Sequence, residues 1–371
     1  MKITYPRMGD WTAPLGGMLE QMGLPVVRPP VPSDRTRNIG ARLSPEFICY
    51  PLKLNLGNYV EAYELGADTV LMGGGVGPCR FGYYATLQKD ILADAGYPMD
   101  FIVLEPPKGH TLPLISQLRR LIQNVSLRDF LRAVEVAWVK LQAMEDIHIL
   151  ANQVRALEAA PGQTSAVYRE QIALLDSATT VESVRARWSR ARQALYHIRK
   201  VHREGVPVVR LIGEIYMISE PFANLDVEER LGRMGVCVEN TLSLVDYIRQ
   251  NLIADALRLR RDRSLQEEAR PYLAHFVGGE GVESVGNTVR AARQGCDGVV
   301  HVMPFTCMPE IVAQSVIPSV SQEYGIPVLT LILDEHSAEA GVQTRLEAFV
   351  DLIQSRKRSG DESCQSTWVS M

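Results

Sequence analysis

Short apolar runs alternate with helical patterns through most of this 371-residue chain. In the first part, strand-like runs occupy residues 2–5, 26–27, 47–49, 69–72 and 101–104, and helical patterns occupy 11–22, 54–65 and 81–95. Strands that are separated by helices are joined by crossovers, and crossovers connect parallel strands. The pattern therefore predicts a parallel sheet covered by helices.

The same alternation returns in the second part, after a long helical stretch. Strand-like runs occupy 207–212, 236–238, 298–303 and 328–333, with helical patterns at 225–234, 241–263, 280–294, 309–324 and 342–355. Residues 115–203 lack such runs and break once, at 159–162, which favours a hairpin or small bundle of helices. We expect an α/β protein with an N-terminal domain at 1–112, a helical segment at 113–205, a C-terminal domain at 206–358 and a loose tail at 359–371.

Composition and charge narrow the function classes. A net charge of -4 offers no basic footprint for nucleic acid. The first residues, MKITYPRMG, lack the basic and apolar regions of a signal peptide, and no apolar stretch is long enough to span a membrane. We therefore expect a cytoplasmic protein without membrane or nucleic-acid partners.

Three of the six cysteines follow apolar runs and lie beside proline or glycine. These are Cys49, Cys79 and Cys307, and Cys79 and Cys307 fall between a predicted strand and the next helix. Ligands of open α/β sheets bind at the carboxyl ends of the strands, so the three thiols are predicted to meet in one crevice. Thiolates favour iron–sulfur clusters or zinc, and three protein ligands leave one coordination position open.

The other cysteines have different surroundings. Cys237 lies inside a predicted strand, Cys296 at a turn from helix to strand, and Cys364 in the polar tail. We interpret these three as structural residues. Zinc remains the alternative metal, although structural zinc sites usually contain four ligands with a close-spaced pair, and the sequence contains no CxxC.

A glycine-rich loop, GGGVGPCRFG, surrounds Cys79. It has neither the Walker lysine nor the GxGxxG spacing, which argues against a nucleotide site. The amides of Gly75 and Gly77 are instead suited to donate hydrogen bonds to cluster sulfides. Arg80 is a candidate partner for an anionic substrate.

Three carboxylates near predicted strand ends are candidates for proton transfer. They are Glu46, Glu214 and Glu335. For each of them, the alternative is a surface or helix-capping role.

Two segments carry a resemblance to a known family. The stretches from FICYPLK to GPCRFGYY and from VVHVMPFTCMPE to RLEAF resemble the 2-hydroxyacyl-CoA dehydratase / benzoyl-CoA reductase superfamily. Within it they are most similar to D-component-like, stand-alone proteins labelled CoA protein activase, which are related to double-cubane cluster proteins. GPCRFGYY and MPFTCMPE are the most specific motifs.

The resemblance implies two flavodoxin-like (Rossmann-like) domains and a [4Fe–4S] cluster bound by Cys49, Cys79 and Cys307. It also implies a partner, an ATP-dependent activase of the actin/Hsp70 fold that donates low-potential electrons, and a homodimer or heterodimer. The ATP-binding signature of the activase is not visible here, so the chain resembles the electron acceptor. A double-cubane cluster would require more cysteine ligands than these three.

The resemblance implies reductive chemistry at a cluster with an open iron. Relatives act on acyl-CoA thioesters or reduce small unsaturated molecules, and the sequence contains no recognisable CoA motif. The alternatives are an electron-transfer or scaffold subunit without its own substrate, and a structural zinc protein.

Overall fold

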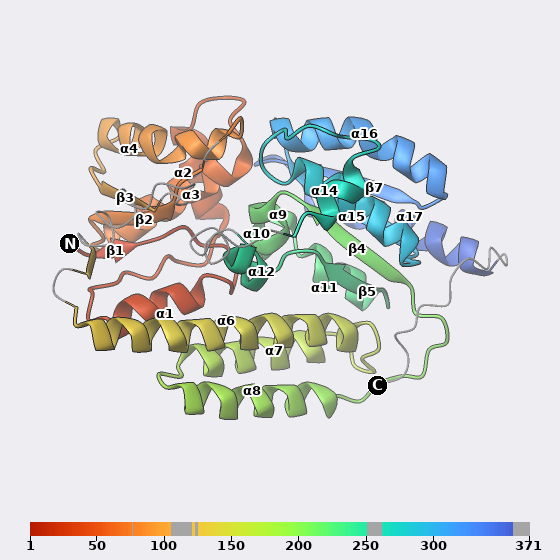
Figure 1. Cartoon of the computed structure of the whole chain (residues 1–371), viewed down its shortest axis with the longest axis horizontal. Coiled ribbons are helices and arrows are strands. Elements are labelled where there is room, and N and C mark those ends of the chain that lie inside the picture. Colours follow the sequence, from red (N-terminus) through yellow and green to blue (C-terminus); the bar gives the residue numbers. More distant parts are fainter. Residues whose placement is uncertain (76, 105–120, 123–124, 251–261, 359–371) are drawn as a thin grey trace. The chain divides into compact units, whose positions relative to one another are not determined.

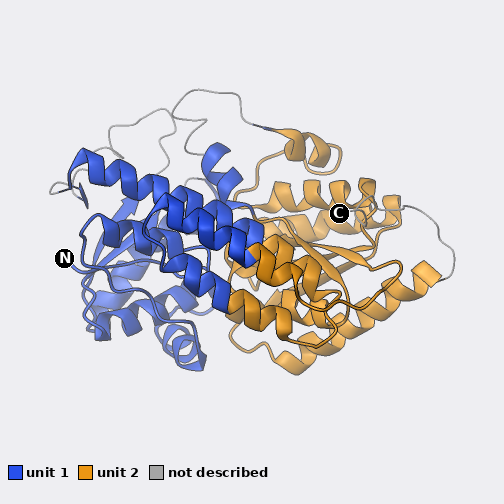
Figure 2. Cartoon of the chain, turned by 90° about the horizontal axis from the view of Figure 1, so that it is seen from below, with its two compact units in different colours: residues 1–147, 170–191, 243–262 blue, residues 148–169, 192–242, 263–371 orange. Residues whose placement is uncertain are grey.

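The computed structural model describes residues 1–75, 77–104, 121–122, 125–250 and 262–358. The chain divides into two compact units (Figure 2). Unit 1 contains Met1–Ile147, Glu170–Ala191 and Ser243–Asp262, and unit 2 contains His148–Arg169, Arg192–Leu242 and Arg263–Met371. Helices α6 (Leu127–Arg155), α7 (Gln163–Asp176) and α8 (Val181–Tyr196) contribute residues to both units.

Unit 1 contains a parallel sheet in the order β1-β2-β3 (Figure 1). Its elements are β1 (Ile3–Thr4), α1 (Ala13–Gln21), α2 (Asp34–Leu43), α3 (Tyr50–Glu64), β2 (Thr69–Gly73), the 3-10 helix η1 (Arg80–Tyr83), α4 (Tyr84–Asp94), β3 (Asp100–Leu104) and α12 (Leu244–Ile248). Alternate residues of β2 face opposite sides of the sheet. Val70 and Met72 pack in the cluster that contains α3, and Leu71 packs with Ile3 and Leu19 of α1.

Helix α3 is buried on nearly every side, because it lies between the sheet and α2. Its backbone contacts that of α2 at two glycines. A Cβ at Gly57 would lie 2.0 Å from the carbonyl oxygen of Thr36, and one at Gly40 would lie 1.8 Å from that of Lys53. Burial on nearly every side explains why this helix is apolar all round.

Unit 2 contains a parallel sheet in the order β5-β4-β6-β7. Its elements are β4 (Val208–Gly213), α9 (Ile215–Ser219), α10 (Pro221–Asn224), α11 (Val227–Arg233), β5 (Cys237–Asn240), α14 (Ser264–Ala269), α15 (Gly281–Arg293), β6 (Gly298–Pro304), α16 (Met308–Tyr324), β7 (Val328–Leu333) and α17 (Glu339–Arg358). Helices α15 and α16 cover one face, where Val285, Val299 and Ile317 are buried together. A Cβ at Gly298 would lie 2.7 Å from Phe349, which places α17 directly against β6.

The two sheets share one strand order. In unit 1, Val26 forms a parallel bridge with Ile3, so the second extended segment of the chain lies beside the first. In unit 2, β5 likewise lies beside β4, and β6 and β7 follow on the other side. This order, second-first-third-fourth, is that of flavodoxin-like sheets. The predicted α/β class with two flavodoxin-like parallel sheets is therefore confirmed.

One predicted strand is wrong. Residues 47–49 form no strand, and the chain passes from a turn at 46–47 directly into α3. The apolar run that begins at Phe47 is the entrance to a buried helix, and a short apolar run cannot distinguish the two structures. The sequence interpretation also omitted α2, whose polar sequence begins with a capping box formed by Ser33 and Thr36.

Two other predictions lie partly or wholly outside the described residues. Helix α12 ends at Ile248 within the helical stretch expected at 241–263, of which residues 251–261 are outside the description. The expected tail at 359–371, with Cys364, is also outside it. Among the described residues, no helix is long and apolar enough to cross a membrane.

Candidate functional site

The three candidate cysteines share a local structure, the N-cap of a helix. Cys49 precedes α3, Cys79 precedes η1 and Cys307 precedes α16, each with an extended backbone and without a side-chain cap hydrogen bond. Proline occupies the first turn of both α3 and α16, where its fixed φ suits the start of a helix. Cys49 thus has the pre-helix position expected of the other two, although it does not follow a strand.

Left-handed backbone conformations precede two of these caps. Phe47 has φ 56° and Thr306 has φ 66°, and they lie two residues and one residue before a cysteine. Such values are rare for aromatic and β-branched residues and cost about 1–3 kcal/mol each. Backbone strain of this kind concentrates at functional sites, and here it turns the chain sharply into the helix that each cysteine caps.

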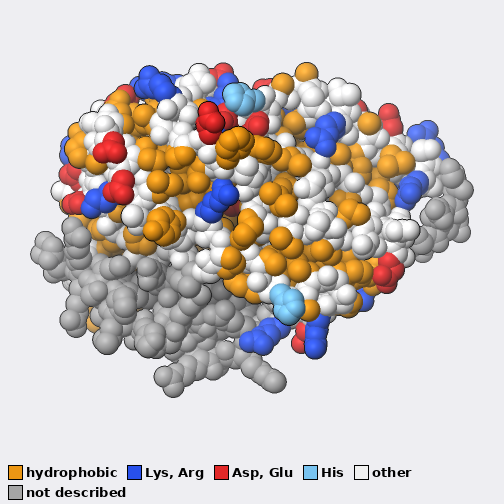
Figure 3. Space-filling view, turned by 90° about the horizontal axis from the view of Figure 1, so that it is seen from above, with side chains coloured by type: hydrophobic (Ala, Val, Ile, Leu, Met, Phe, Trp, Pro, Cys, Tyr) orange, Lys and Arg blue, Asp and Glu red, His pale blue; other side chains and the backbone are white. Residues whose placement is uncertain are grey.

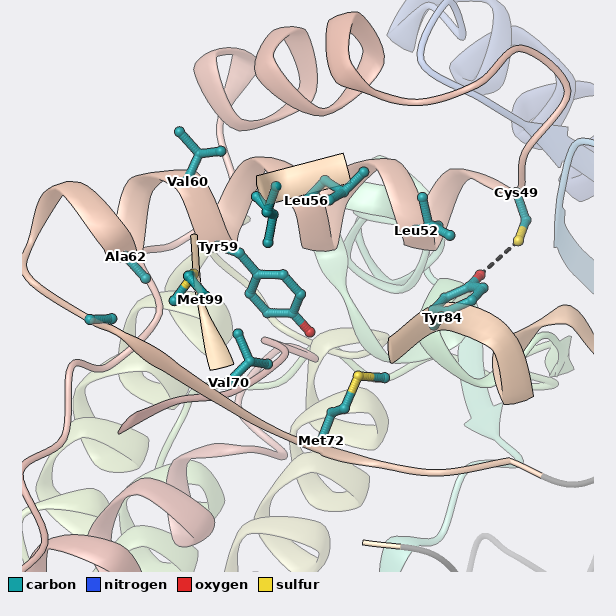
Figure 4. Packing of buried hydrophobic residues seen from close by; sticks show 12 residues of the cluster. Cys49, Leu52, Leu56, Tyr59, Val60, Ala62, Val70, Met72, Tyr84 and Met99 are labelled. Atoms are coloured by element: carbon teal, nitrogen blue, oxygen red, sulfur yellow. Dashed lines mark hydrogen bonds between the residues drawn. The ribbon is translucent and has the colours of Figure 1, made fainter. Parts of the chain in front are cut away.

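Side chains next to Cys79 reach the segment of Cys49 within unit 1. The hydroxyl of Tyr84 lies 2.6 Å from Sγ of Cys49 (Figure 4). The guanidinium of Arg80 donates a 2.9 Å hydrogen bond to the carbonyl oxygen of Phe47. Arg80 and Tyr84 belong to the segment that follows Cys79, so the two cysteine-bearing segments lie side by side.

The glycine-rich loop fits closely against η1. A Cβ at Gly75 would lie 2.7 Å from the ring of Phe81 and 2.9 Å from the amide nitrogen of Gly82. Gly77 has φ 117°, a conformation that L side chains rarely adopt. The two glycines named from the sequence are therefore required by the fold of the loop, and their use as amide donors stays a prediction.

Cys79 and Cys307 occupy equivalent positions in the two sheets. Each follows the third extended segment of its unit, β2 for Cys79 and β6 for Cys307. That segment lies next to the first one, which makes the gap between them the topological switch point of the sheet. Ligands of flavodoxin-like folds bind at this position.

In unit 2, three carboxyl groups gather at the same switch point, of which that of Glu310 is buried and those of Glu214 and Glu280 are half-buried. Glu214 directly follows β4, Glu280 caps α15, and Glu310 lies in the first turn of α16. Burial, and next the charge of Glu310, raise the pKa of Glu214 to about 7. Burial raises the pKa of Glu280 well above its usual range, and Glu214, Glu310 and Glu283 raise it further. The sequence indicated Glu214 alone, because the other two become neighbours only through the packing of α15 and α16.

The remaining candidates are placed as follows. Glu46 is exposed in the turn before Cys49, and Glu335 is partly buried just beyond β7, 3.8 Å from the exposed ring of His336. Arg80 is exposed at the start of η1. The structure does not bring these three to one described site.

Two of the cysteines that we interpreted as structural lie in or next to β-strands. Cys237 begins β5, and Cys296 lies in the turn before β6, 3.7 Å from a carboxylate oxygen of Glu239. Burial raises the pKa of both thiols to about 12. Both thiols are therefore harder to ionise than an ordinary cysteine.

Exposed apolar side chains flank each candidate cysteine. Phe47, Phe81 and Tyr83 lie in the segments of Cys49 and Cys79, and Phe305, Met308 and Ile311 lie around Cys307. Figure 3 shows apolar side chains spread over one face of the protein. Cys49 and Cys307 are themselves only 8% exposed.

The donor chemistry suits a thiolate-bound metal group. Cys49 and Cys79 belong to unit 1 and Cys307 to unit 2. Within the part of the chain that the structure describes, no group of three or more Cys, His, Asp or Glu side chains is arranged to hold a single metal ion. The N-termini of α3 and α16 favour negative charge on the thiols of their N-cap residues, Cys49 and Cys307. Cysteine thiolates are the usual ligands of iron–sulfur clusters.

Comparison with known proteins adds no assignment. No protein-family profile and no curated protein matches the chain.

Proposed function

We propose that the chain is an iron–sulfur protein of the 2-hydroxyacyl-CoA dehydratase / benzoyl-CoA reductase type. Cys49, Cys79 and Cys307 would hold a [4Fe–4S] cluster with one iron open. The observation that carries the proposal is that these three cysteines each cap a helix, whereas Cys237 and Cys296 lie in or beside strands. A helix N-terminus favours negative charge on a cysteine beside it, which suits a thiolate ligand.

The protein's own residues would position and tune the site. Tyr84 places a hydroxyl against Sγ of Cys49, and Arg80 ties the turn at Phe47 to the segment of Cys79. The amides of Gly75 and Gly77, in the tightly packed loop before Cys79, would donate hydrogen bonds to the cluster. Hydrogen bonds to sulfur are among the factors that set cluster potentials. When bound, the cluster supplies single electrons to a substrate that is hard to reduce.

The apolar residues around the cysteines suit two needs of this chemistry. They keep water from a reactive site, and they offer a surface to a partner protein. We propose an ATP-dependent activase of the actin/Hsp70 fold as the electron donor. The substrate class is an acyl-CoA thioester or a small unsaturated molecule, and the location is the reducing cytoplasm, as a homodimer or heterodimer.

The test is anaerobic purification followed by iron and sulfide analysis and EPR of the reduced protein. About four irons per chain with matching sulfide are expected for a single cubane. Cys49→Ser, Cys79→Ser and Cys307→Ser should each lose most of the iron, and the matched variants Cys237→Ser and Cys296→Ser should retain it. Zinc without sulfide would establish the structural zinc alternative, and equal iron loss in the control variants would reject this choice of ligands.

A further inference from the structure

The carboxyl groups of unit 2 converge near the turn that carries Cys307. The amide of Glu214 bonds to the carbonyl oxygen of Val302 at 3.2 Å, so the end of β4 lies against β6. A Cβ at Gly281 would lie 2.6 Å from the carbonyl oxygen of Pro309, so the start of α15 abuts the first turn of α16. Glu214, Glu280 and Glu310 therefore come from three elements that meet at one point.

Glu310 connects this group to the turn that carries Cys307. It follows Cys307 by three residues, and such pairs lie on the same side of a helix. Its Oε2 lies 2.7 Å from Nε2 of His301, and both side chains are fully buried. The other ring nitrogen of His301 lies 3.5 Å from the hydroxyl of Thr330.

The second carboxyl oxygen of Glu310 lacks a hydrogen-bond partner among the described residues, although it is buried. A buried acceptor without a donor costs about 1–3 kcal/mol. A neighbouring carboxyl group that carries a proton is a suitable donor, because its O–H can donate a hydrogen bond to a carboxylate oxygen. The orphaned oxygen is therefore an open acceptor for a neighbouring group that carries a proton.

Electrostatics lead to the same conclusion independently. Burial disfavours the ionised forms of Glu214 and Glu280, and each also feels the charge of Glu310. Glu283, one turn into α15, is likewise shifted toward its neutral form, first by burial. Burial and neighbouring like charges thus favour the protonated forms of Glu214 and Glu280.

We propose that Glu214, Glu280 and Glu310 form a proton store that supplies protons to the reduction at the neighbouring Cys307. This inference rests on the proposed function. The electron comes from the proposed ATP-dependent activase, and one carboxylic acid O–H breaks as its proton forms a C–H or O–H bond on the singly reduced substrate. The resulting carboxylate recovers a proton from solvent. Glu283 provides the route, because it is half-buried and accepts a 2.9 Å hydrogen bond from Gln266 on the outer helix α14.

The first test reads protonation directly in the iron-free protein. Infrared spectroscopy distinguishes the C=O band of a buried carboxylic acid from the bands of carboxylates. The band should be present at neutral pH, smaller in Glu280→Gln and in Glu214→Gln, and unchanged in Glu347→Gln, an exposed control on α17. Either buried variant suffices if the other does not fold. Absence of the band from the unmodified protein at neutral pH would overturn the proposal.

The second test reads the link between the store and the metal site. The iron-loaded protein is titrated with titanium(III) citrate at a series of pH values. Because deprotonation adds negative charge beside the site, the midpoint potential should fall as the pH rises through about 7, and fall less in Glu214→Gln. A potential independent of pH overturns the supply of protons to this site. If the protein shows the carboxylic acid band but binds no iron, the proposed function is rejected and the shared protons of the carboxyl groups are not.

Discussion

The hydroxyl of Tyr84 lies 2.6 Å from Sγ of Cys49, although 35 residues separate them. Tyr84 begins α4, which follows Cys79 and η1, so the second cysteine segment supplies a contact to the first cysteine. Both residues are buried in the core of unit 1. Through this contact, the candidate ligand Cys49 is held by the packed core of unit 1.

The first prediction concerns this contact. Tyr84→Phe keeps the ring and removes the hydroxyl, so the sulfur of Cys49 loses a hydrogen-bond donor. Fewer donors to ligand sulfur make a cluster harder to reduce, so the midpoint potential of the iron-loaded protein should become more negative. Tyr83→Phe is the matched control, because Tyr83 is the exposed neighbour. Equal potentials in the two variants would contradict the assignment.

Arg80 is expected to hold the two cysteine segments of unit 1 together. Arg80→Met retains much of the side-chain volume and removes the hydrogen bond to the carbonyl oxygen of Phe47. Iron should then pass to a chelator several-fold faster, because the turn before Cys49 is less constrained. Arg42→Met, at an exposed position on α2, should release iron at the rate of the unmodified protein. Identical rates in both variants would show that the hydrogen bond is dispensable.

Gly213 is required at the end of β4. It has φ 138°, and a Cβ there would lie 1.9 Å from the carbonyl oxygen of Val302. Gly213→Ala should lower the free energy of unfolding by roughly 2–5 kcal/mol, from backbone strain and overpacking. Gly73→Ala, at the end of β2, meets nothing within 4 Å and should cost less than about 1 kcal/mol. Urea denaturation followed by circular dichroism measures both, and similar losses would be inconsistent with this packing.

Glu228 provides a pH-dependent prediction. Burial opposes its ionisation, but His148, Asn240 and Arg155 outweigh burial and lower its pKa to about 2 from 4.5. Because the folded pKa is depressed, the stabilisation is present above about pH 4.5 and is lost as the pH falls toward about 2. It amounts to roughly 3 kcal/mol.

The measurement is urea unfolding at several pH values across that interval. Glu228→Gln cannot titrate, so its stability should fall less steeply on acidification than that of the unmodified protein. Glu347→Gln, which is exposed, should keep the original slope. If Glu228→Gln also kept it, the acid sensitivity would arise elsewhere.

Local patterns along the chain predicted most of the helices and strands. The strands of unit 2 are rich in β-branched residues and are separated by helices of clear periodicity, so β4, β6 and β7 were expected within about one residue of their bounds. The run at Phe47–Cys49 misled, because an apolar helix buried on all sides has the same local composition as a buried strand. The helix α2 was missed because its sequence is polar, and its contact with α3 is visible only in the structure.

Some residues of the candidate site were predicted from the sequence, and others were found only in the structure. The residues that follow an apolar run beside proline or glycine are visible in the sequence, and they led to Cys49, Cys79 and Cys307. Tyr84 was not indicated, because its contact with Cys49 depends on the packing of α4 against α3. Glu280 and Glu310 were also not indicated, since ordinary carboxylates become unusual only when folding buries them together.

The sequence by itself thus determined the α/β class, the candidate thiols and the glycine loop, because these depend on periodicity and on residue chemistry. Only the tertiary structure decided that the two sheets share one strand order and that Cys79 and Cys307 hold equivalent places in it. It also decided that the acids of unit 2 gather at the switch point between β4 and β6. The physical reason is that strand order, burial and the repulsion between buried charges arise from contacts between residues far apart in the chain, which no local pattern records.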